Sequence, residues 1–419
     1  MAKRKTRDGR VLPDGVSERG DGRFLYRYKM YGKQHYIYDR DLNELKKKIE
    51  VLKIDIAKGR DIDLANLSLN QYYPQYLDNY KEGRIKQASF LNKQKYFDWY
   101  IRPFDIGAMP MREIKRTHVI SHFQYLADKK GLSDGTLKTL ASMLGLAMQE
   151  VIYDGGVFVN PFLNVMENVT AKPKVRRIAL TREEQNALIE YLKREGEFQT
   201  NYLPIIGILL GTAMRIGEVL ALTWNDIDFE HEEIHVSKTM NYRTRVEGGG
   251  HEFYITTPKT PNAVRDIPMS ADVKKLFQDQ QSYQKNLRIR SDISIPQRDE
   301  RGNIIKNYKG FVFTTKLGYP FTHEGFTSTL RRIVKNYNEM EVMKAKEENR
   351  KPVVLPDITA HVFRHTACTR MIEQGIPPER TQIVMGHASI KTTLDIYTTV
   401  SKDIRRKVKV DLDSISNIF

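Results

Sequence analysis

Six side chains in the sequence have types suited to the cleavage of a phosphodiester bond. They are two arginines, two histidines, a lysine and a tyrosine: Arg215, Lys259, His361, Arg364, His387 and Tyr397. A guanidinium fork binds two phosphate oxygens at once. An ammonium or imidazole group can move protons, and a phenol can act as a nucleophile. Together these groups suit the attack of a tyrosine on a DNA phosphodiester.

The two arginines are the candidates for holding the phosphate. Arg215 opens a predicted helix whose apolar stripe, with Ile216 and Val219, would fix it in place. His361 and Arg364 are three residues apart and therefore share one face of a helix. Fixed guanidinium donors stabilise the negative charge of the transition state, and losing one such donor typically costs about 10²–10³ in rate. Taken alone, a histidine and an arginine at this spacing are more often a surface pair.

The remaining groups would move protons and attack the phosphorus. Lys259 lies in the sequence PKT at the tip of a predicted hairpin. From there it could protonate the departing 5′ oxygen, and a general acid is worth about 10²–10⁴ in rate. His387 precedes a helix that Ser389 could start, and Tyr397 lies further along that helix. The phenol has an ordinary pKa of about 10 and needs activation at neutral pH. A lysine in a turn is usually only solvated, and any one of the 22 tyrosines is usually a packing residue. The prediction therefore rests on the complete set.

The composition indicates a multidomain protein with a polyanionic partner. A length of 419 residues allows two or three domains. The net charge of +16 favours nucleic acid as the partner, although it could serve solubility alone. Cys368 is the only cysteine, which excludes an internal disulfide and cysteine-rich metal sites and fits a reducing cytoplasm. No apolar run approaches the roughly 18 residues of a membrane span, and the basic N-terminus lacks the apolar stretch of a secretion signal.

Residues 1–60 are predicted to form a small basic module built on a β-hairpin. The sequence RFLYRYKM alternates, so that Phe24, Tyr26 and Tyr28 would line one face of the sheet. The opposite face would carry three basic residues: Arg23, Arg27 and Lys29. A two-stranded ribbon with a cationic face can enter a major groove. We therefore expect this module to bind DNA, the alternative being a solvated, charged hairpin.

Helices are predicted to follow the hairpin. The first should run from about Asp41 to Lys58, and its apolar residues recur with a helical period that would cover the aromatic face of the sheet. These residues are Leu42, Leu45, Ile49, Leu52 and Ile56. Residues 66–170 then read as all helical, with Gly131 and other breakers between amphipathic stretches. Trp99 and the tyrosines of this region are expected in its core.

The last part of the chain is predicted to mix helices with a small antiparallel sheet. A basic linker at residues 171–177 precedes it and could follow a phosphate backbone. The linker cations are Lys172, Lys174, Arg176 and Arg177. Within residues 178–410, the segments IHVSKTMNY, HEFYITTP and AVRDIPM are strand-like, and VEGGG would turn between the first two. Residues 289–308 are predicted to be a polar insertion.

The chemical groups and their order resemble a known family. The segments GTAMRIGEVLAL, PKT, HVFRHTA and MGHASIKTTLDIY occur in the order found in the tyrosine recombinases, or phage-type integrases. The resemblance extends over most of the chain. Glu218 matches an acidic position that often supports the first arginine in that family. Thr399 departs from the pattern, since many members have a histidine there, but that position is not catalytic. The basic, tyrosine-rich N-terminal module and the inserted hairpin are most similar to integrases of conjugative transposons.

The resemblance implies both a domain organisation and a mechanism. The expected parts are an arm-binding module, an all-α core-binding domain, a mainly helical catalytic domain and a C-terminal tail: residues 1–60, 66–170, 178–410 and 411–419. The six groups named first would assemble around the scissile phosphate, and Tyr397 would become linked to the DNA 3′ end. The implied activity is integration and excision of a mobile element, with no metal, ATP or other cofactor.

The same resemblance implies partners. One is double-stranded DNA that carries core and arm sites. Another is the chain itself, as three further copies in a homotetramer. An excisionase and a DNA-bending host protein are also compatible with the resemblance. The tail carries an apolar stripe at Leu412, Ile415 and Ile418. A helix this short must dock, either on its own catalytic domain or on that of a neighbour. Exchange between neighbours is the favoured interpretation.

Three other interpretations share part of this pattern. A type IB topoisomerase uses similar groups to relax DNA, but a separate N-terminal module and core-binding domain favour recombination. A site-specific DNA-binding protein without activity would have no need of Tyr397. A metal-dependent transposase requires an acidic cluster for two cations, and no such cluster stands out in the sequence.

Overall fold

The fold is that of a computed structural model, in which the chain divides into two compact units at residues 1–174 and 175–419. The structure describes residues 6–30, 33–57, 59–85, 87–173, 179–194, 202–244, 250–257, 261–290, 292–299 and 303–397. Within these ranges, no helix combines the length and apolar character that crossing a membrane requires. The two units are described separately below.

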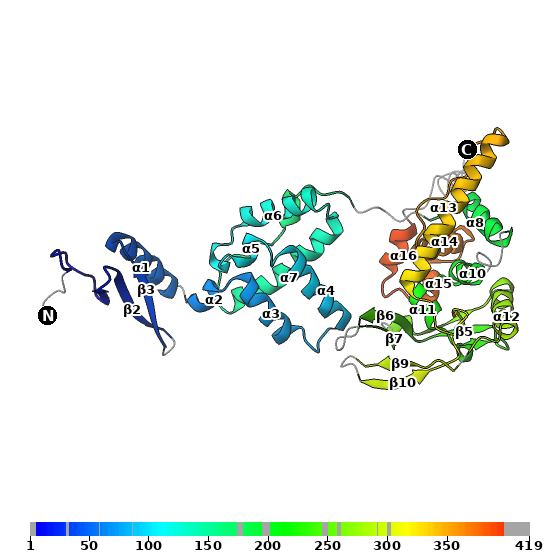
Figure 1. Ribbon diagram of the computed structural model, residues 1–419, viewed down its shortest axis with the longest axis horizontal. Helices are drawn as coiled ribbons and strands as arrows, with labels where there is room; N and C mark the ends of the chain where they lie inside the picture. The colour runs from blue at the N-terminus through cyan, green and yellow to red at the C-terminus, as the bar shows by residue number, and fades with distance from the viewer. Residues whose placement is uncertain are drawn as a thin grey trace, which may run out of the picture. The chain divides into compact units, whose positions relative to one another are not determined.

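The first unit begins with a three-stranded antiparallel sheet and a helix that covers it (Figure 1). The elements are β1 (Val16–Glu18), β2 (Phe24–Met30), β3 (Lys33–Asp39) and α1 (Leu42–Ala57). Phe24 and Tyr26 of β2 pack with Leu45 of α1, whereas Arg27 and Lys29 are exposed on the opposite face. The prediction of an aromatic and a basic face is confirmed. The short strand β1 was not predicted.

The helix α1 departs from its prediction at one end. Its first four apolar residues are buried as expected, but the Ile56 side chain is 41% exposed. The apolar cluster between α1 and the sheet ends at Ile49 of this helix, and Ile56 lies about two helical turns beyond it. The expected burial of Ile56 is therefore wrong.

The rest of the first unit is all helical, as predicted (Figure 1). The elements are α2 (Ile62–Asn66), α3 (Leu69–Tyr80), α4 (Gln87–Tyr100), α5 (Asp105–Ala108), η1 (Met111–Glu113), α6 (Arg116–Lys129), α7 (Asp134–Tyr153) and η2 (Val165–Asn168). Its core contains Tyr73, which stacks on Phe97 with 4.4 Å between the ring centroids. Trp99, expected in this core, is 59% exposed because it lies two residues from Phe97 and faces away from the core side of α4.

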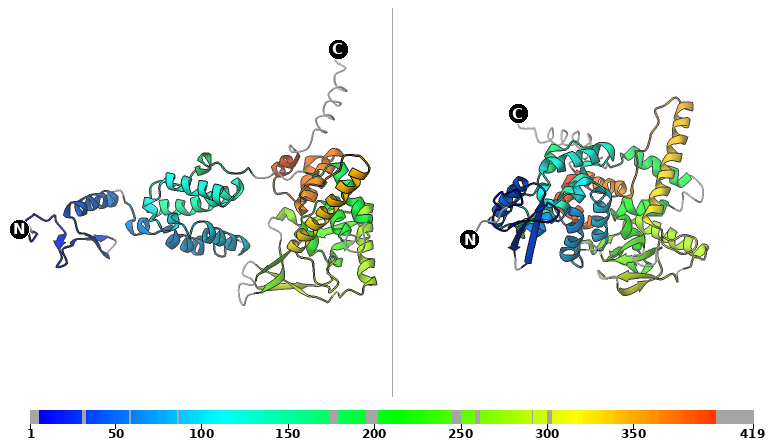
Figure 2. Two further views of the ribbon diagram at one scale, coloured as in Figure 1. Left: turned by 45° about the horizontal axis from the view of Figure 1, so that its top comes forward. Right: turned by 60° about the vertical axis from the view of Figure 1, so that its left-hand side comes forward.

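The second unit combines a group of helices with two small sheets, and α12 lies beside β5 (Figure 1, Figure 2). The helices are α8 (Arg182–Arg194), α10 (Leu203–Thr212), α11 (Ile216–Ala221), η3 (Trp224–Asp226), η4 (Pro261–Ala263), α12 (Ala271–Asn286), α13 (His323–Glu347), α14 (Ala360–Glu373), α15 (Pro378–Met385) and α16 (Ile390–Tyr397). The strands are β4 (Ile227–Asp228), β5 (Glu233–Val236), β6 (Thr239–Thr244), β7 (His251–Thr256), β8 (Arg265–Pro268), β9 (Ile295–Arg298) and β10 (Ile304–Tyr308).

The prediction of one antiparallel sheet is wrong in two respects. Two sheets form, in the orders β4-β5-β8 and β10-β9-β7-β6, and β7 pairs with β9 in parallel. The segment predicted as one strand, IHVSKTMNY, divides into β5 and β6, which belong to different sheets. Between them lies Lys238, which is 3% exposed and paired with Asp226. This buried pair fixes the point at which the chain leaves one sheet for the other. The predicted insertion supplies β9 and β10.

The helix α10 packs on several other helices of the second unit and brings together the segments that carry the candidate residues. Its sequence, LPIIGILLGT, is apolar all round, as expected for a helix buried on several sides. It packs against α12 and α14. A Cβ at Gly207 would lie 2.5 Å from Leu276, and one at Gly211 would lie 2.5 Å from Val273. Glycine at these two positions therefore allows α12 to approach α10 closely.

Candidate active site

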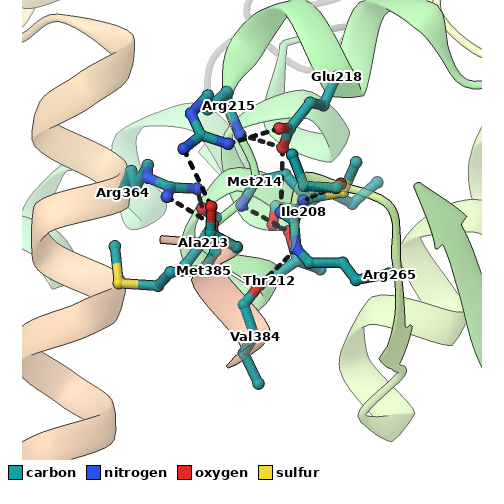
Figure 3. Close-up of polar contacts among 12 residues, drawn as sticks. Ile208, Thr212, Ala213, Met214, Arg215, Glu218, Arg265, Arg364, Val384 and Met385 are labelled. Atoms are coloured by element: carbon teal, nitrogen blue, oxygen red, sulfur yellow. Dashed lines mark hydrogen bonds and ion pairs between the residues drawn. The ribbon is translucent and has the colours of Figure 1, made fainter. Parts of the chain in front are cut away.

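The corner between α10 and α11 places the first arginine. Ala213 ends α10 in the left-handed conformation, with φ of 54°, and Arg215 is the residue before the first turn of α11. The main-chain N–H of Arg215 donates to Glu218 Oε2 at 2.9 Å, and its guanidinium Nη1 donates to Oε1 at 2.8 Å. Glu218 therefore holds Arg215 at both main chain and side chain (Figure 3). The supporting position predicted for Glu218 is confirmed in the structure.

The second arginine is aimed by main-chain carbonyl groups. Arg364 lies on α14 and is 4% exposed. Its guanidinium donates to the carbonyl oxygens of Ala213 at 2.5 Å and Met385 at 2.6 Å (Figure 3). Burial, with the positive charge of Arg215 nearby, lowers the pKa of Arg364 to about 9, which leaves it protonated at neutral pH. The two predicted phosphate-binding arginines thus lie at one corner of the fold.

A third arginine, Arg265, belongs to the same cluster and was not predicted. It donates to Glu218 Oε2 at 3.0 Å, to the carbonyl oxygen of Ala263 at 2.9 Å and to that of Val384 at 2.7 Å. Burial opposes the ionisation of Glu218, but Arg265 and Arg215 beside it lower its pKa below the ordinary value. Alternation along β8, which buries Arg265 with Ile267 and exposes their neighbours, is the signal that could have indicated an inward-facing arginine.

The second histidine lies where α15 ends. Gly386 closes α15 with a φ of 61°, and its carbonyl oxygen accepts from Arg215 at 3.3 Å. His387 follows and is 8% exposed. Its Nδ1 lies 2.9 Å from the hydroxyl oxygen of Thr393 on α16. Burial, with Arg364 and Arg215 nearby, lowers the pKa of His387 to about 3, so the ring is neutral at pH 7.

The other three predicted groups are placed less fully. His361 is the second residue of α14, exposed, and lies on the same helix as Arg364 as predicted. Tyr397 is the last residue of α16, and its side chain lies outside the described residues. Lys259 also lies outside them. The hairpin predicted around Lys259 is wrong, because the flanking strands β7 and β8 belong to different sheets.

Some of the predicted DNA-binding residues lie in the described part of the chain, and others lie outside it. Arg23, Arg27 and Lys29 are exposed on the outer face of the N-terminal sheet. Lys172 is exposed and its carbonyl oxygen accepts from the main-chain N–H of Asp134. Three linker residues lie outside the described part of the chain: Lys174, Arg176 and Arg177.

The cluster around Glu218 is suited to an anionic ligand. Arg215 and Arg265 pair with the Glu218 carboxylate, and Arg364 lies close enough to interact electrostatically with these groups, so positive charge is in excess. The Arg215 side chain is 37% exposed, which leaves one guanidinium accessible, whereas Arg364 is held rigidly behind it. Fixed cationic donors of this kind can stabilise the extra charge on a phosphate in a transition state. The geometry is therefore appropriate for phosphoryl transfer.

Comparison with known proteins supports the same chemistry. Residues 179–403 match the phage integrase family. Residues 1–55 match the DNA-binding domain of the Tn916 integrase, and residues 68–127 match the N-terminal SAM-like domain of phage integrases. All three matches follow the order expected from the sequence.

Similar proteins include two transposases and an integrase of known structure. The chain is 28% identical to the transposase of transposon Tn916 from Enterococcus faecalis and to that of Tn1545 from Streptococcus pneumoniae, over 96% of this chain and 94% of each relative. The Tn1549 transposon integrase, solved in complex with transposon right end DNA, is 28% identical and superposes with a TM-score of 0.68. That match covers 83% of this chain and the whole of the solved one. The chain belongs to the phage integrase family and is a tyrosine-type site-specific DNA recombinase.

Proposed function

We propose that the chain integrates and excises a mobile element, and that Tyr397 is the nucleophile that cuts and rejoins its DNA. The observation that carries this proposal is the convergence of Arg215, Arg364 and His387 at the corner between α10, α11 and α15. The helix that ends with Tyr397 begins three residues after His387 and packs on both α14 and α15. The nucleophile thus belongs to an element that is attached to the phosphate-binding cluster.

The reaction exchanges one phosphodiester for another. The Tyr397 oxygen attacks the scissile phosphorus, the phenol proton leaves to a nearby base, and a bond from tyrosine to the 3′ phosphate forms. The bond between phosphorus and the 5′ oxygen breaks, and Lys259 donates a proton to that oxygen. Arg215 and Arg364 bind the non-bridging oxygens as their charge grows. A 5′ hydroxyl of another strand reverses the steps, so that neither ATP nor metal is consumed.

A trapping experiment tests the chemistry. A duplex with the joined ends of the element and a nick beside the cut site lets the cleaved strand diffuse away, so that the covalent protein–DNA adduct accumulates on a denaturing gel. The unsubstituted protein should form this adduct in the presence of a chelator. Tyr397→Phe should bind the duplex with unchanged affinity and form none. Adduct formation by Tyr397→Phe would show that another residue is the nucleophile.

The same substrate separates recombination from DNA relaxation. A recombinase should exchange strands between two duplexes that carry the site and relax supercoiled plasmid poorly when the site is missing. Efficient relaxation without the site would favour a type IB topoisomerase activity. Binding without any adduct in the unsubstituted protein would favour a silent DNA-binding protein.

The N-terminal sheet is proposed to bind a second DNA site, the arm site, in a major groove. Its outer face combines exposed cations with the exposed rings of Tyr36 and Tyr38, and Tyr36 lies opposite Arg27 in the strand register. Cations can contact phosphates while aromatic and polar tips contact base edges. Arg27→Ala should weaken binding to arm DNA and leave cleavage of the core site unchanged. Lys47→Ala, on the covering helix α1 and paired with Glu44, is the matched control.

We also propose that four copies assemble on two core sites in the cytoplasm and exchange their tails. The proposal rests on the apolar stripe of residues 411–419 and on the family resemblance. Truncation after Val410 should weaken the pairing of two sites while single-site binding persists. Adding tail-truncated protein to Tyr397→Phe protein should restore some cleavage, because the intact tails are then supplied by the partner. Normal tetramers of the truncated protein would show that the tail packs only on its own domain.

A further inference from the structure

One hydrogen bond connects the proposed nucleophile helix to the proposed phosphate-binding cluster. His387 Nδ1 lies 2.9 Å from the Thr393 hydroxyl oxygen, and both residues are buried, with Thr393 fully so. Thr393 belongs to α16 and precedes Tyr397 by four residues. Residues four apart share one face of a helix. The contact therefore lies on the face of α16 that also carries the position of Tyr397.

The direction of this hydrogen bond decides what the histidine can offer to a phosphate. A neutral imidazole carries one proton, so one ring nitrogen donates and the other accepts. If the Thr393 hydroxyl donates to Nδ1, the proton must lie on Nε2, and Nε2 becomes a donor. If Nδ1 donates to the hydroxyl oxygen, Nε2 is an acceptor and would repel an anionic oxygen. Only the first arrangement suits a phosphate.

The surroundings of His387 make the tautomer matter. Burial lowers the pKa of His387, and the charges of Arg364, Arg215, His365 and Arg265 nearby lower it further, so the ring is neutral. A protonated ring could donate from both nitrogens whatever its partner, but a neutral ring depends on the group at Nδ1. A buried donor at that position is therefore the means by which the fold can select one tautomer.

We propose that Thr393 is a positioning residue of the recombinase: its hydroxyl donates to His387 Nδ1, which leaves the Nε2 proton for a non-bridging oxygen of the scissile phosphate. The same hydrogen bond connects α16 to the end of α15, so that one contact aligns the nucleophile helix with the imidazole ring of His387. This inference rests on the phosphate-binding role proposed above for His387 and extends it to a residue that does not touch the DNA.

Substitutions at neighbouring threonines separate this role from ordinary packing. Thr393→Val keeps the size and branching of the side chain but removes the hydroxyl, whereas Thr393→Ser keeps the hydroxyl. Thr392→Val changes the exposed neighbour on the same helix and is the matched control. Each full-length variant is tested with the nicked duplex of joined element ends for binding affinity and for the rate of adduct formation.

We expect Thr393→Val to bind the duplex normally and to cleave it about 10–100-fold more slowly, as is typical when the partner that orients a functional histidine is lost. Thr393→Ser and Thr392→Val should cleave at nearly the unsubstituted rate. In a His387→Asn background, Thr393→Val should cause little further loss, because its effect passes through the ring. An equal loss in both backgrounds, or no loss in either, would overturn the proposal.

A spectroscopic measurement tests the tautomer without relying on the cleavage rate or on a substitution of Thr393. The ¹⁵N chemical shifts of the histidine ring distinguish a protonated nitrogen from an unprotonated one, and the His387 signals are those that His387→Asn removes. Full-length Tyr397→Phe protein should show a proton on Nε2 of His387. A proton on Nδ1 would refute the inference. If His387→Asn cleaves normally, the role proposed for His387 in cleavage fails and the expected effect of Thr393 on the rate fails with it, whereas the direction of the hydrogen bond is decided by the ¹⁵N shifts alone.

Discussion

Replacing Arg265 by methionine should destabilise the catalytic unit far more than replacing an exposed arginine. The Arg265 side chain is 5% exposed and pairs with Glu218, which is 2% exposed. Methionine can fill much of the same space, but it leaves the Ala263 and Val384 carbonyl oxygens without this donor. It also leaves the buried Glu218 carboxylate with Arg215 alone. The substitution therefore removes one member of a buried charge pair while the other stays in place.

The expected magnitude follows from that burial. Breaking a buried ion pair by removing one partner costs about 3–5 kcal/mol. In a domain of about 150–250 residues, each kcal/mol lowers the melting temperature by about 2–4 °C, so the expected decrease is about 6–20 °C. Adduct formation should fall as well, because a carboxylate that loses Arg265 no longer holds Arg215 in one position.

Thermal unfolding followed by circular dichroism measures the first effect, with Arg290→Met as the control. Arg290 also pairs with a carboxylate, through two hydrogen bonds to Asp292, but both side chains are more than 60% exposed. An exposed pair is worth about 0–1 kcal/mol, so this control should shift the melting temperature little. Equal shifts for Arg265→Met and Arg290→Met would refute the view that Arg265 supports the cluster.

Three further outcomes are expected. Arg215→Lys keeps the charge but loses the fork, so adduct formation should fall by about 10²–10³ while duplex affinity changes little; equal losses of both would indicate a structural role instead. His387 stays neutral in the fold down to a pKa of about 3, whereas the unfolded chain takes up a proton below its ordinary value of 6.5. The free energy of unfolding should therefore decrease as pH falls from 6.5 towards 3. His387→Asn should make this decrease smaller when the unfolding free energy is measured by denaturant at each pH. The same decrease in the variant would contradict the assignment to His387. Lys238→Met leaves Asp226 buried without its partner, so chemical denaturation should show a loss of about 3–5 kcal/mol. Lys138→Met, which removes one member of the more exposed pair with Asp134, should show almost no loss of unfolding free energy.

Local patterns in the sequence predicted the elements that carry the site. The apolar stripe after Arg215 placed this residue at the start of a helix, where α11 begins. The spacing of His361 and Arg364 placed both on one helix, α14, and Ser389 correctly marked the start of α16. Each of these features depends on residues within one or two helical turns, and such patterns can be read without knowledge of distant contacts.

Contacts between distant segments were the part that could not be predicted. Arg265 reaches Glu218 across 47 residues, and nothing in the strand-like segment AVRDIPM identifies that partner. The division of one predicted strand into β5 and β6 depends on the buried pair of Lys238 with Asp226, 12 residues earlier. The exposure of Trp99 depends on which side of α4 meets the core. A hydrophobic residue type alone does not decide this.

Arg364 shows why the sequence indicates a candidate phosphate-binding group more readily than the atoms that orient it. Its two hydrogen bonds go to carbonyl oxygens of residues 151 and 21 positions away. Every residue has a carbonyl group, so no choice of side chain at Ala213 or Met385 marks these acceptors. What directs them is backbone shape: the left-handed turn at Ala213 and the end of α15 before Gly386. Orientation of this guanidinium is therefore a property of two helix ends, and it depends on their backbone conformation rather than on the side chains found there.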